Sequence, residues 1–127
     1  MTGRVVHFEI PFEDDVRAFS FYLGAFGWHI DTVPGMGYAL VSTGPMSKEG
    51  EPLGKGYIGG GMLPRQEPVT GPVVTIDCED IDNVLRTVVD LGGEVVRGKA
   101  PVGDMGFTAY IRDTEGNVIG LWQDAGG

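Results

Sequence analysis

Apolar and polar residues alternate along the first segment of the chain. The alternation has a period of two, which is typical of a strand with one packed face and one open face. Pro11 cannot donate a main-chain hydrogen bond, so it is expected to end the strand. The predicted packed face carries Val6, Phe8 and Ile10, and the predicted open face carries Val5, His7 and Glu9.

After Pro11 the spacing of apolar residues changes to every third or fourth position. Acidic residues, Glu13 to Asp15, come first, and negative charge is favourable at a helix N-terminus. Gly27 follows the pattern and is suited to a helix C-cap. We therefore predict an amphipathic helix whose stripe carries Val16, Phe19, Tyr22, Leu23 and Phe26.

Three further strands are expected in the first half of the chain. Clusters of proline and glycine separate them and are typical of turns and loops. The longest irregular segment, Gly44 to Gly56, predicts a long loop. The expected strands are residues 28–33, 38–43 and 55–62, and residues 63–71 are expected to form a linker.

The second half repeats this order of elements. One constant shift along the sequence carries His7 onto Val73 and Gly27 onto Gly93. An internal repeat of this kind indicates a duplicated module. We expect a strand at 73–78 with Val74, Ile76 and Cys78 on its packed face, a helix at 81–91 with Ile81, Val84, Leu85 and Val88 in its stripe, and strands at 94–97, 107–112 and 118–123.

Together these patterns predict an α+β fold. A single domain over residues 1–127 would contain two tandem βαβββ modules, at about 4–62 and 72–124, which form a cupped mixed sheet with the helices on its outer face. The open faces of the strands would line the cup. Their residues are charged, small and aromatic instead of uniformly aliphatic, so we expect a solvent-filled pocket there.

Composition narrows the classes of partner. The 127 residues carry a formal net charge of −9, which disfavours nucleic acid and anionic membranes as partners. The single cysteine, Cys78, excludes an internal disulfide and fits a reducing compartment. No apolar run is long enough to predict a membrane span, and no signal-peptide pattern is evident. We expect a cytoplasmic protein whose partner is a small molecule.

Four segments resemble the vicinal oxygen chelate superfamily, which includes glyoxalase I, extradiol dioxygenases, fosfomycin-resistance proteins and bleomycin-binding proteins. They are Val6 to Ile10, Phe21 to Trp28, Cys78 to Asp82 with Leu91 to Gly93, and Ile111 to Trp122. The resemblance implies paired βαβββ modules around a cup. It also implies a metal site in the enzymes of the superfamily, with ligands from the first and last strand of each module.

Carried onto this chain, the implied metal positions are His7, Gly59, Val73 and Gly120. Only His7 has a side chain that can bind a metal, so we expect no metal and no other cofactor. The alternative is a divalent ion held by His7 and carboxylates such as Glu9 or Asp77. His29 is expected on a different strand and does not complete such a set.

Eight residues are candidates for ligand binding. His7 would act as a hydrogen-bond partner or general base, or else be satisfied by a neighbouring group such as Glu9. Trp122 would be a wall for a planar ligand, or else a plug or a subunit contact. Tyr38, Tyr57 and Tyr110 could each donate a hydroxyl. The eight candidates are His7, Glu9, Tyr57, Gly59, Thr75, Tyr110, Gly120 and Trp122, and no catalytic residue is assigned.

Three functions remain open from the sequence. The leading hypothesis is a metal-free small-molecule binding protein that forms a homodimer and resembles the drug-sequestering members of the superfamily. The alternative is a metal-dependent enzyme of glyoxalase or dioxygenase type, acting on a substrate with vicinal oxygens. A third is a domain whose cup is filled by its own side chains and which serves only assembly.

Overall fold

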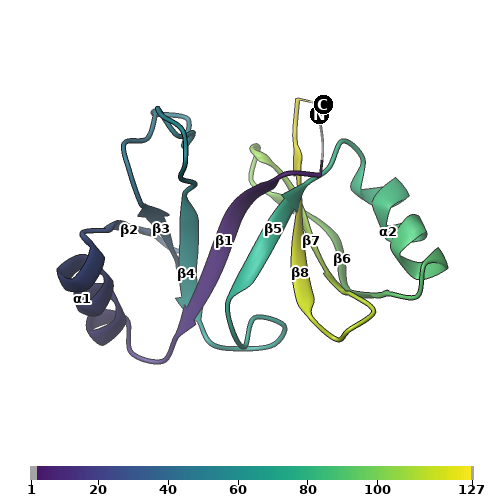
Figure 1. The fold of residues 1–127 in the computed structure, drawn as a ribbon, viewed down its shortest axis with the longest axis horizontal. Coiled ribbons are helices and arrows are strands. Elements are labelled where there is room, and N and C mark those ends of the chain that lie inside the picture. The colour runs from purple at the N-terminus through teal and green to yellow at the C-terminus, as the bar shows by residue number, and fades with distance from the viewer. Residues whose placement is uncertain (1–2, 127) are drawn as a thin grey trace. The chain divides into compact units, whose positions relative to one another are not determined.

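The computed structural model describes residues 3–126 and confirms an α+β fold of two tandem βαβββ modules (Figure 1). Over these residues the chain forms eight strands and two helices. They divide into two compact units, described separately below. The N-terminal module is residues 7–72, and the C-terminal module is residues 73–126 together with residues 3–6. No helix within residues 3–126 is long and apolar enough to cross a membrane.

The N-terminal module is a mixed sheet with one helix. Its strands lie in the order β2-β3-β4-β1, with β1 parallel to β4 and the other neighbours antiparallel. Its elements are β1 (Val5–Phe12, which begins in the residues assigned to the C-terminal module), α1 (Asp15–Phe26), β2 (His29–Val33), β3 (Tyr38–Ser42) and β4 (Gly60–Pro64).

Helix α1 begins and ends where the sequence predicts. The Asp14 side chain accepts a hydrogen bond of 3.0 Å from the backbone N–H of Arg17, which caps the first turn. Gly27 adopts the left-handed conformation with φ of 72°, a region that glycine enters without steric cost. These local signals are sufficient to fix the limits of the helix.

The apolar stripe predicted for α1 is not buried, although an amphipathic helix normally packs its apolar side on a core. None of the residues 15–26 is buried, and Val16, Leu23 and Phe26 are 71%, 61% and 62% exposed. The helix lies beside β2 (Figure 1), and its aromatic rings pack mainly on one another and on Trp28. The Tyr22 and Trp28 rings are stacked, with centroids 4.7 Å apart.

Pro11 does not end the first strand, contrary to the prediction. In a parallel ladder only every second residue directs its main-chain groups toward a given neighbour. Phe12 is such a residue, since its carbonyl accepts from Arg65 N at 2.8 Å. Pro11, in register with Leu63, directs its nitrogen away from β4, so its missing N–H costs no bond in this ladder.

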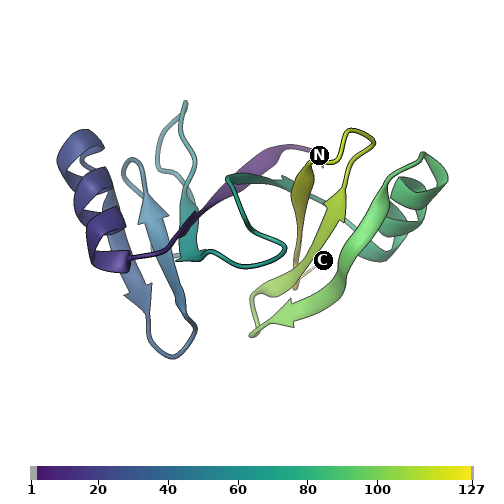
Figure 2. The same cartoon turned by 90° about the horizontal axis from the view of Figure 1, so that it is seen from below.

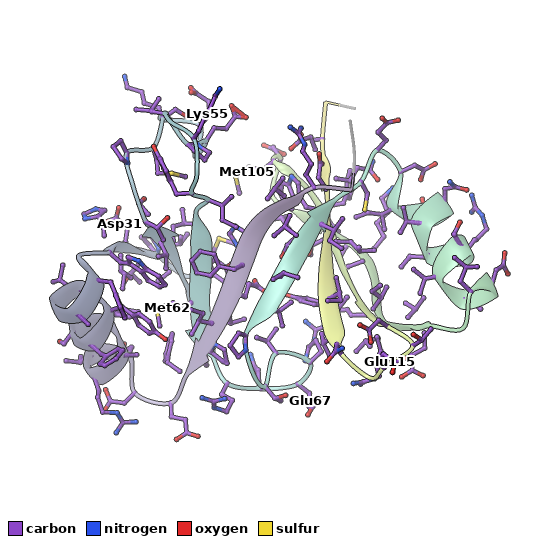
Figure 3. The ribbon with its side chains drawn as sticks, in the orientation of Figure 1. Asp31, Lys55, Met62, Glu67, Met105 and Glu115 are labelled. Atoms are coloured by element: carbon purple, nitrogen blue, oxygen red, sulfur yellow. The ribbon has the colours of Figure 1, made fainter. Side chains whose placement is uncertain are left out.

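The fourth strand begins at Gly60, later than predicted, because the residues before it belong to the long loop. Tyr57 holds this loop, since its hydroxyl donates to the carbonyl of Pro45 at 2.6 Å. A Cβ atom at Gly44 would lie 2.7 Å from the Tyr57 ring, so the glycine makes room for the ring. The tip of the loop, which includes Lys55, extends beyond the sheet (Figure 3).

The C-terminal module repeats the order of elements with a longer third strand. Its strands lie in the order β5-β8-β7-β6, with β5 parallel to β8. The third strand runs to Val102 instead of Arg97, because register shifts after Val95 and Arg97 let it bend and continue. The elements are β5 (Val73–Asp77), α2 (Ile81–Asp90), β6 (Glu94–Val102), β7 (Gly106–Arg112) and β8 (Val118–Asp124).

Helix α2 covers a core, as its sequence pattern predicts. It packs along β6 (Figure 2), and Ile81 is 0% exposed. Burial raises the pKa of the Cys78 thiol, which fits the structural role expected for that residue. The core consists of Cys78, Ile81, Ala109, Ile111 and Leu121, with Val84, Leu85 and Val88 of the predicted stripe packed against it.

The expected division of the strand faces into packed and open holds only in part. Ile76 packs against the core, but Val74 is 42% exposed. Val73 and Thr75, predicted to face open solvent, are buried, as is Glu9 of β1. Alternation alone identifies which residues share a face, and it does not reveal what covers each face.

Candidate functional site

A relay of two hydrogen bonds joins three side chains of the N-terminal module. His7 and Glu9 are two residues apart on β1 and therefore project from the same face. His7 Nε2 is 2.8 Å from the Tyr38 hydroxyl, and that hydroxyl donates to Glu9 Oε2 at 2.9 Å. We refer to these side chains as the His7–Tyr38–Glu9 relay.

The relay depends on a glycine in the strand between its members. Strand β4 lies between β3, which begins at Tyr38, and β1. Gly61 of β4 is in register with Glu9, and a Cβ atom built on Gly61 would overlap the Tyr38 hydroxyl. Tyr38 can therefore cross β4 to reach β1 only because residue 61 has no side chain.

The proton positions in the relay follow from its chemistry. A tyrosine hydroxyl has one proton, and here it is donated to the Glu9 carboxylate, so His7 must donate its own Nε2–H to Tyr38. Burial lowers the pKa of His7, an effect that the charge of Glu9 partly opposes. His7 is thus neutral at neutral pH, with its proton on Nε2 and a lone pair on Nδ1.

The C-terminal module has a similar arrangement with a shorter hydroxyl side chain. Thr75 is in register with Gly120, and a Cβ atom at Gly120 would lie 2.8 Å from Thr75 Oγ1. Tyr110 is in register with Gly120 on the other side, and the Arg97 guanidinium lies 5.8 Å from the centre of its ring. In both modules a hydroxyl therefore occupies the space beside a glycine of the last strand.

The strand registers correct one of the predicted metal positions. Glu9 pairs with Gly61 in one module and Thr75 pairs with Gly120 in the other, so Gly61, and not Gly59, is the counterpart of Gly120. Gly59 lies before β4, where a Cβ atom would be 2.8 Å from the Met46 methyl group. Residues 59–61 are all glycine, so the sequence contains no side-chain pattern that would distinguish Gly61 from Gly59 as the matching position.

The corrected positions do not fit a divalent metal. His7 is the only one with a ligating side chain, and its Nε2 is engaged as a donor to Tyr38. Hydroxyl groups fill the space where side chains at Gly61 and Gly120 would project. Within residues 3–126 no three His, Cys, Asp or Glu side chains are grouped so that they could hold a metal ion.

Two of the eight predicted residues, Tyr57 and Trp122, are engaged by local contacts within their own modules. Tyr57 is in the long loop, where its hydroxyl is bonded to Pro45, and not on a strand. Trp122 Nε1 donates to Asp124 at 2.8 Å, and its ring lies 2.7 Å from where a Cβ atom of Gly106 would be. The ring is thereby held against its own sheet.

Sequence reasoning missed the importance of Tyr38 and Gly61. Tyr38 is only one of three tyrosines that the sequence offers as hydroxyl donors, and nothing in the sequence distinguishes Gly61 from the glycines beside it. The signal that could have found them is a strand-leading tyrosine together with a glycine in the neighbouring strand.

Two cavities of the N-terminal module lie beside α1, away from the relay. One has a volume of about 220 Å³ and is lined by residues that include Phe12, Arg17 and Arg65. The other has a volume of about 320 Å³ and is lined by residues that include Phe19, Leu23 and Trp28. None of the eight predicted ligand-binding residues lines either cavity.

The chain is similar in sequence to one described family and to curated proteins of two mycobacteria. The family described as "Bleomycin resistance protein-like N-terminal" matches residues 4–44. The CFP32 proteins of Mycobacterium bovis and Mycobacterium tuberculosis, named provisionally as glyoxylases, are 32% identical over 115 residues. The match covers 87% of this chain and 41% of theirs, so the chain spans less than half the length of these relatives.

Solved structures of similar fold include two methylmalonyl-CoA epimerases. The Streptomyces coelicolor enzyme, in complex with 2-nitronate-propionyl-CoA, has a TM-score of 0.65 at 18% identity, with 98% of this chain and 96% of that chain covered. The Mycobacterium tuberculosis enzyme has a TM-score of 0.60 at 19% identity, with 94% and 87% covered. At these identities the likeness concerns the fold alone. The family match and the curated relatives confirm the resemblance to the vicinal oxygen chelate superfamily, and the solved structures agree with it in fold.

Proposed function

We propose that this protein binds a small organic molecule without the help of a divalent metal. The observation that carries the proposal is the Tyr38 hydroxyl, which lies in the space beside Gly61 and bonds to both His7 and Glu9. A metal bound through His7 Nε2 would have to displace the Tyr38 hydroxyl, and the imidazole proton would have to leave Nε2.

Polar groups suited to orienting a ligand are already held in place. A binding site needs a few fixed donors and acceptors, and the relay fixes the orientation of His7 through Tyr38 and Glu9. The epimerases of similar fold bind CoA esters according to their structures, and CFP32 is named a glyoxylase. A small-molecule ligand for this chain agrees with both.

The alternative is a metal-dependent enzyme of glyoxalase or dioxygenase type. It is favoured by the position of His7 and Glu9, which share one face of β1 and are bridged by a single hydroxyl. If Tyr38 rotated away, the two side chains could together contribute one nitrogen and one carboxylate ligand. The remaining ligands would have to come from water or substrate.

The two functions are separated by a ligand screen with and without metal. We expect small molecules to raise the melting temperature of the chelator-treated protein, because a ligand of the native state stabilises it. Tyr38→Phe should lose most of that increase, and Gly24→Ala, where a new methyl group meets nothing within 4 Å, is the matched control. Stabilisation that requires added zinc, nickel, iron or manganese would instead establish the alternative.

We also propose that the protein is a cytoplasmic homodimer in which α1 faces the second copy. Val16, Leu23 and Phe26 follow a helical spacing and are largely exposed, so one side of α1 presents large apolar side chains that a partner could cover. An identical helix would cover this surface symmetrically. Sedimentation at micromolar concentration should reveal twice the mass of one chain, and a purely monomeric species would rule out the dimer.

A further inference from the structure

The geometry points to a ligand that donates an N–H or O–H hydrogen bond to Nδ1 of His7. The inference rests on the proposed function and adds the chemical class of the ligand. The group that His7 offers to a ligand is a nitrogen lone pair, which accepts hydrogen bonds and therefore requires a donor in the ligand.

The first step of the argument is the direction of the hydrogen bonds. Glu9 accepts from Tyr38, and Tyr38 in turn accepts from His7, so the imidazole proton is drawn to Nε2. The partner of one ring nitrogen determines what the other nitrogen can do. Nδ1 of the neutral ring is therefore an acceptor.

The second step is the accessibility of Nδ1. The hydrogen bond of the His7 ring is made at Nε2. Within residues 3–126 no buried side-chain nitrogen or oxygen lacks a hydrogen-bond partner. Nδ1, which makes no such bond, is therefore not fully buried, and a ligand group can approach it.

The third step is the exclusion of other ligand classes. A carboxylate, a ketone or a diketone has acceptors only, and two acceptors facing each other repel. The Glu9 carboxylate, one hydroxyl away, further opposes an anion. Alcohols, amides, phenols and ammonium groups meet the requirement, and the net charge of −9 favours neutral or cationic molecules among them.

The first test measures the tautomer of His7 directly by ¹⁵N NMR of the imidazole ring in labelled protein at neutral pH. We expect a proton on Nε2 and none on Nδ1. Tyr38→Phe should abolish the preference, since it removes the acceptor for Nε2–H while it retains the ring. A proton on Nδ1 in the unaltered protein would overturn the inference without affecting the proposed function.

The second test compares three probes that share a phenyl ring: benzyl alcohol, benzylamine and benzoate. Titrations followed at the His7 ring should detect the two donors, with an affinity for benzoate at least about tenfold weaker, as expected for one lost hydrogen bond. Equal or tighter binding of benzoate at His7, or no response of Nδ1 to either donor, would refute the inference. A full ligand screen that raises the melting temperature with no compound would instead refute the proposed function.

A matched pair of substitutions separates the two ring nitrogens. In His7→Gln the amide nitrogen can replace Nε2 and still donate to Tyr38, but the Nδ1 acceptor is lost. In His7→Asn the amide oxygen can replace Nδ1, and the bond to Tyr38 is lost. We expect His7→Gln to weaken benzyl alcohol binding about tenfold and His7→Asn to weaken it less. The reverse order would contradict an acceptor at Nδ1.

Discussion

The two modules share an order of elements but differ in how their helices are used. Ile81 of α2 is fully buried in a core formed with β7 and β8. None of the residues 15–26 of α1 is buried, although its apolar stripe is more aromatic. The same local pattern of apolar residues therefore gives a packed helix in one copy and an exposed helix in the other.

The difference also concerns the strands. In the C-terminal module the apolar core lies under the helix, and the Thr75 hydroxyl fills the space beside Gly120. In the N-terminal module a long tyrosine crosses a strand to reach His7 and Glu9. Both modules have buried apolar residues, Met62 and Val69 among those of the N-terminal one, so the difference lies in how each uses its helix and its polar side chains.

The largest effect is expected from Ile81→Ala in the C-terminal module. The side chain is completely buried, so its removal leaves a cavity and should lower the free energy of unfolding by about 2–5 kcal/mol. Urea denaturation followed by circular dichroism measures it. A loss below about 1 kcal/mol would mean that α2 is not the stabilising helix, and the contrast between the modules would fail.

A smaller effect is expected from Gly61→Ala in the N-terminal module. The new methyl group overlaps the Tyr38 hydroxyl, so the ring must move and the relay must break. We expect a loss of stability of about 1–3 kcal/mol and loss of ligand binding. Gly98→Ala is the control, because a Cβ atom there meets nothing within 4 Å. Retention of ligand binding in Gly61→Ala would show that the relay is not needed for function.

Local sequence signals were sufficient for much of the fold. The limits of α1 and the register of the repeat follow from Asp14, Gly27 and the matching segment around Asp80, since caps and periods act over a few residues. The stripe of α2 was also predicted correctly, with Ile81 buried and Val84, Leu85 and Val88 packed against the core. The exposure of α1 was not predicted. The spacing of its apolar residues shows which side of the helix is apolar, and it contains no information about what packs against that side.

Only part of the His7–Tyr38–Glu9 relay could be predicted from the sequence. His7 and Glu9 are adjacent on one strand face, so their proximity follows from the period of two. Tyr38 is 31 residues from His7, and its place in the relay depends on the reach of a side chain over Gly61. Such a contact arises from the strand order and register, neither of which a single sequence specifies.

The next largest effect is expected from pH, because the titration of His7 affects the stability of the N-terminal module. Burial lowers the pKa of folded His7 below its ordinary value of 6.5, so the unfolded chain takes up a proton first as the pH falls. The contribution of His7 to stability is thus complete above pH 6.5 and is lost as the pH falls from 6.5 toward the folded pKa. Urea midpoints at about pH 7.5 and about pH 5 should differ more for the unaltered protein than for His7→Gln. Equal differences would mean that His7 is not buried as a neutral ring.

The smallest effect on stability is expected from Phe26→Ser on the exposed side of α1. Phe26 is 62% exposed, so Phe26→Ser removes little buried surface and should change the free energy of unfolding by no more than about 0.5 kcal/mol. The same change should weaken self-association, because it places a hydroxyl in the surface proposed to face a second copy. Val74→Ser is a suitable control, since Val74 is an exposed apolar residue of the other module. If Phe26→Ser destabilised the monomer as much as Ile81→Ala, α1 would be a packed helix and the two modules would be equivalent. If the sedimenting mass fell while stability held, the exposed stripe would be an interface, and the contrast between the helices would reflect assembly.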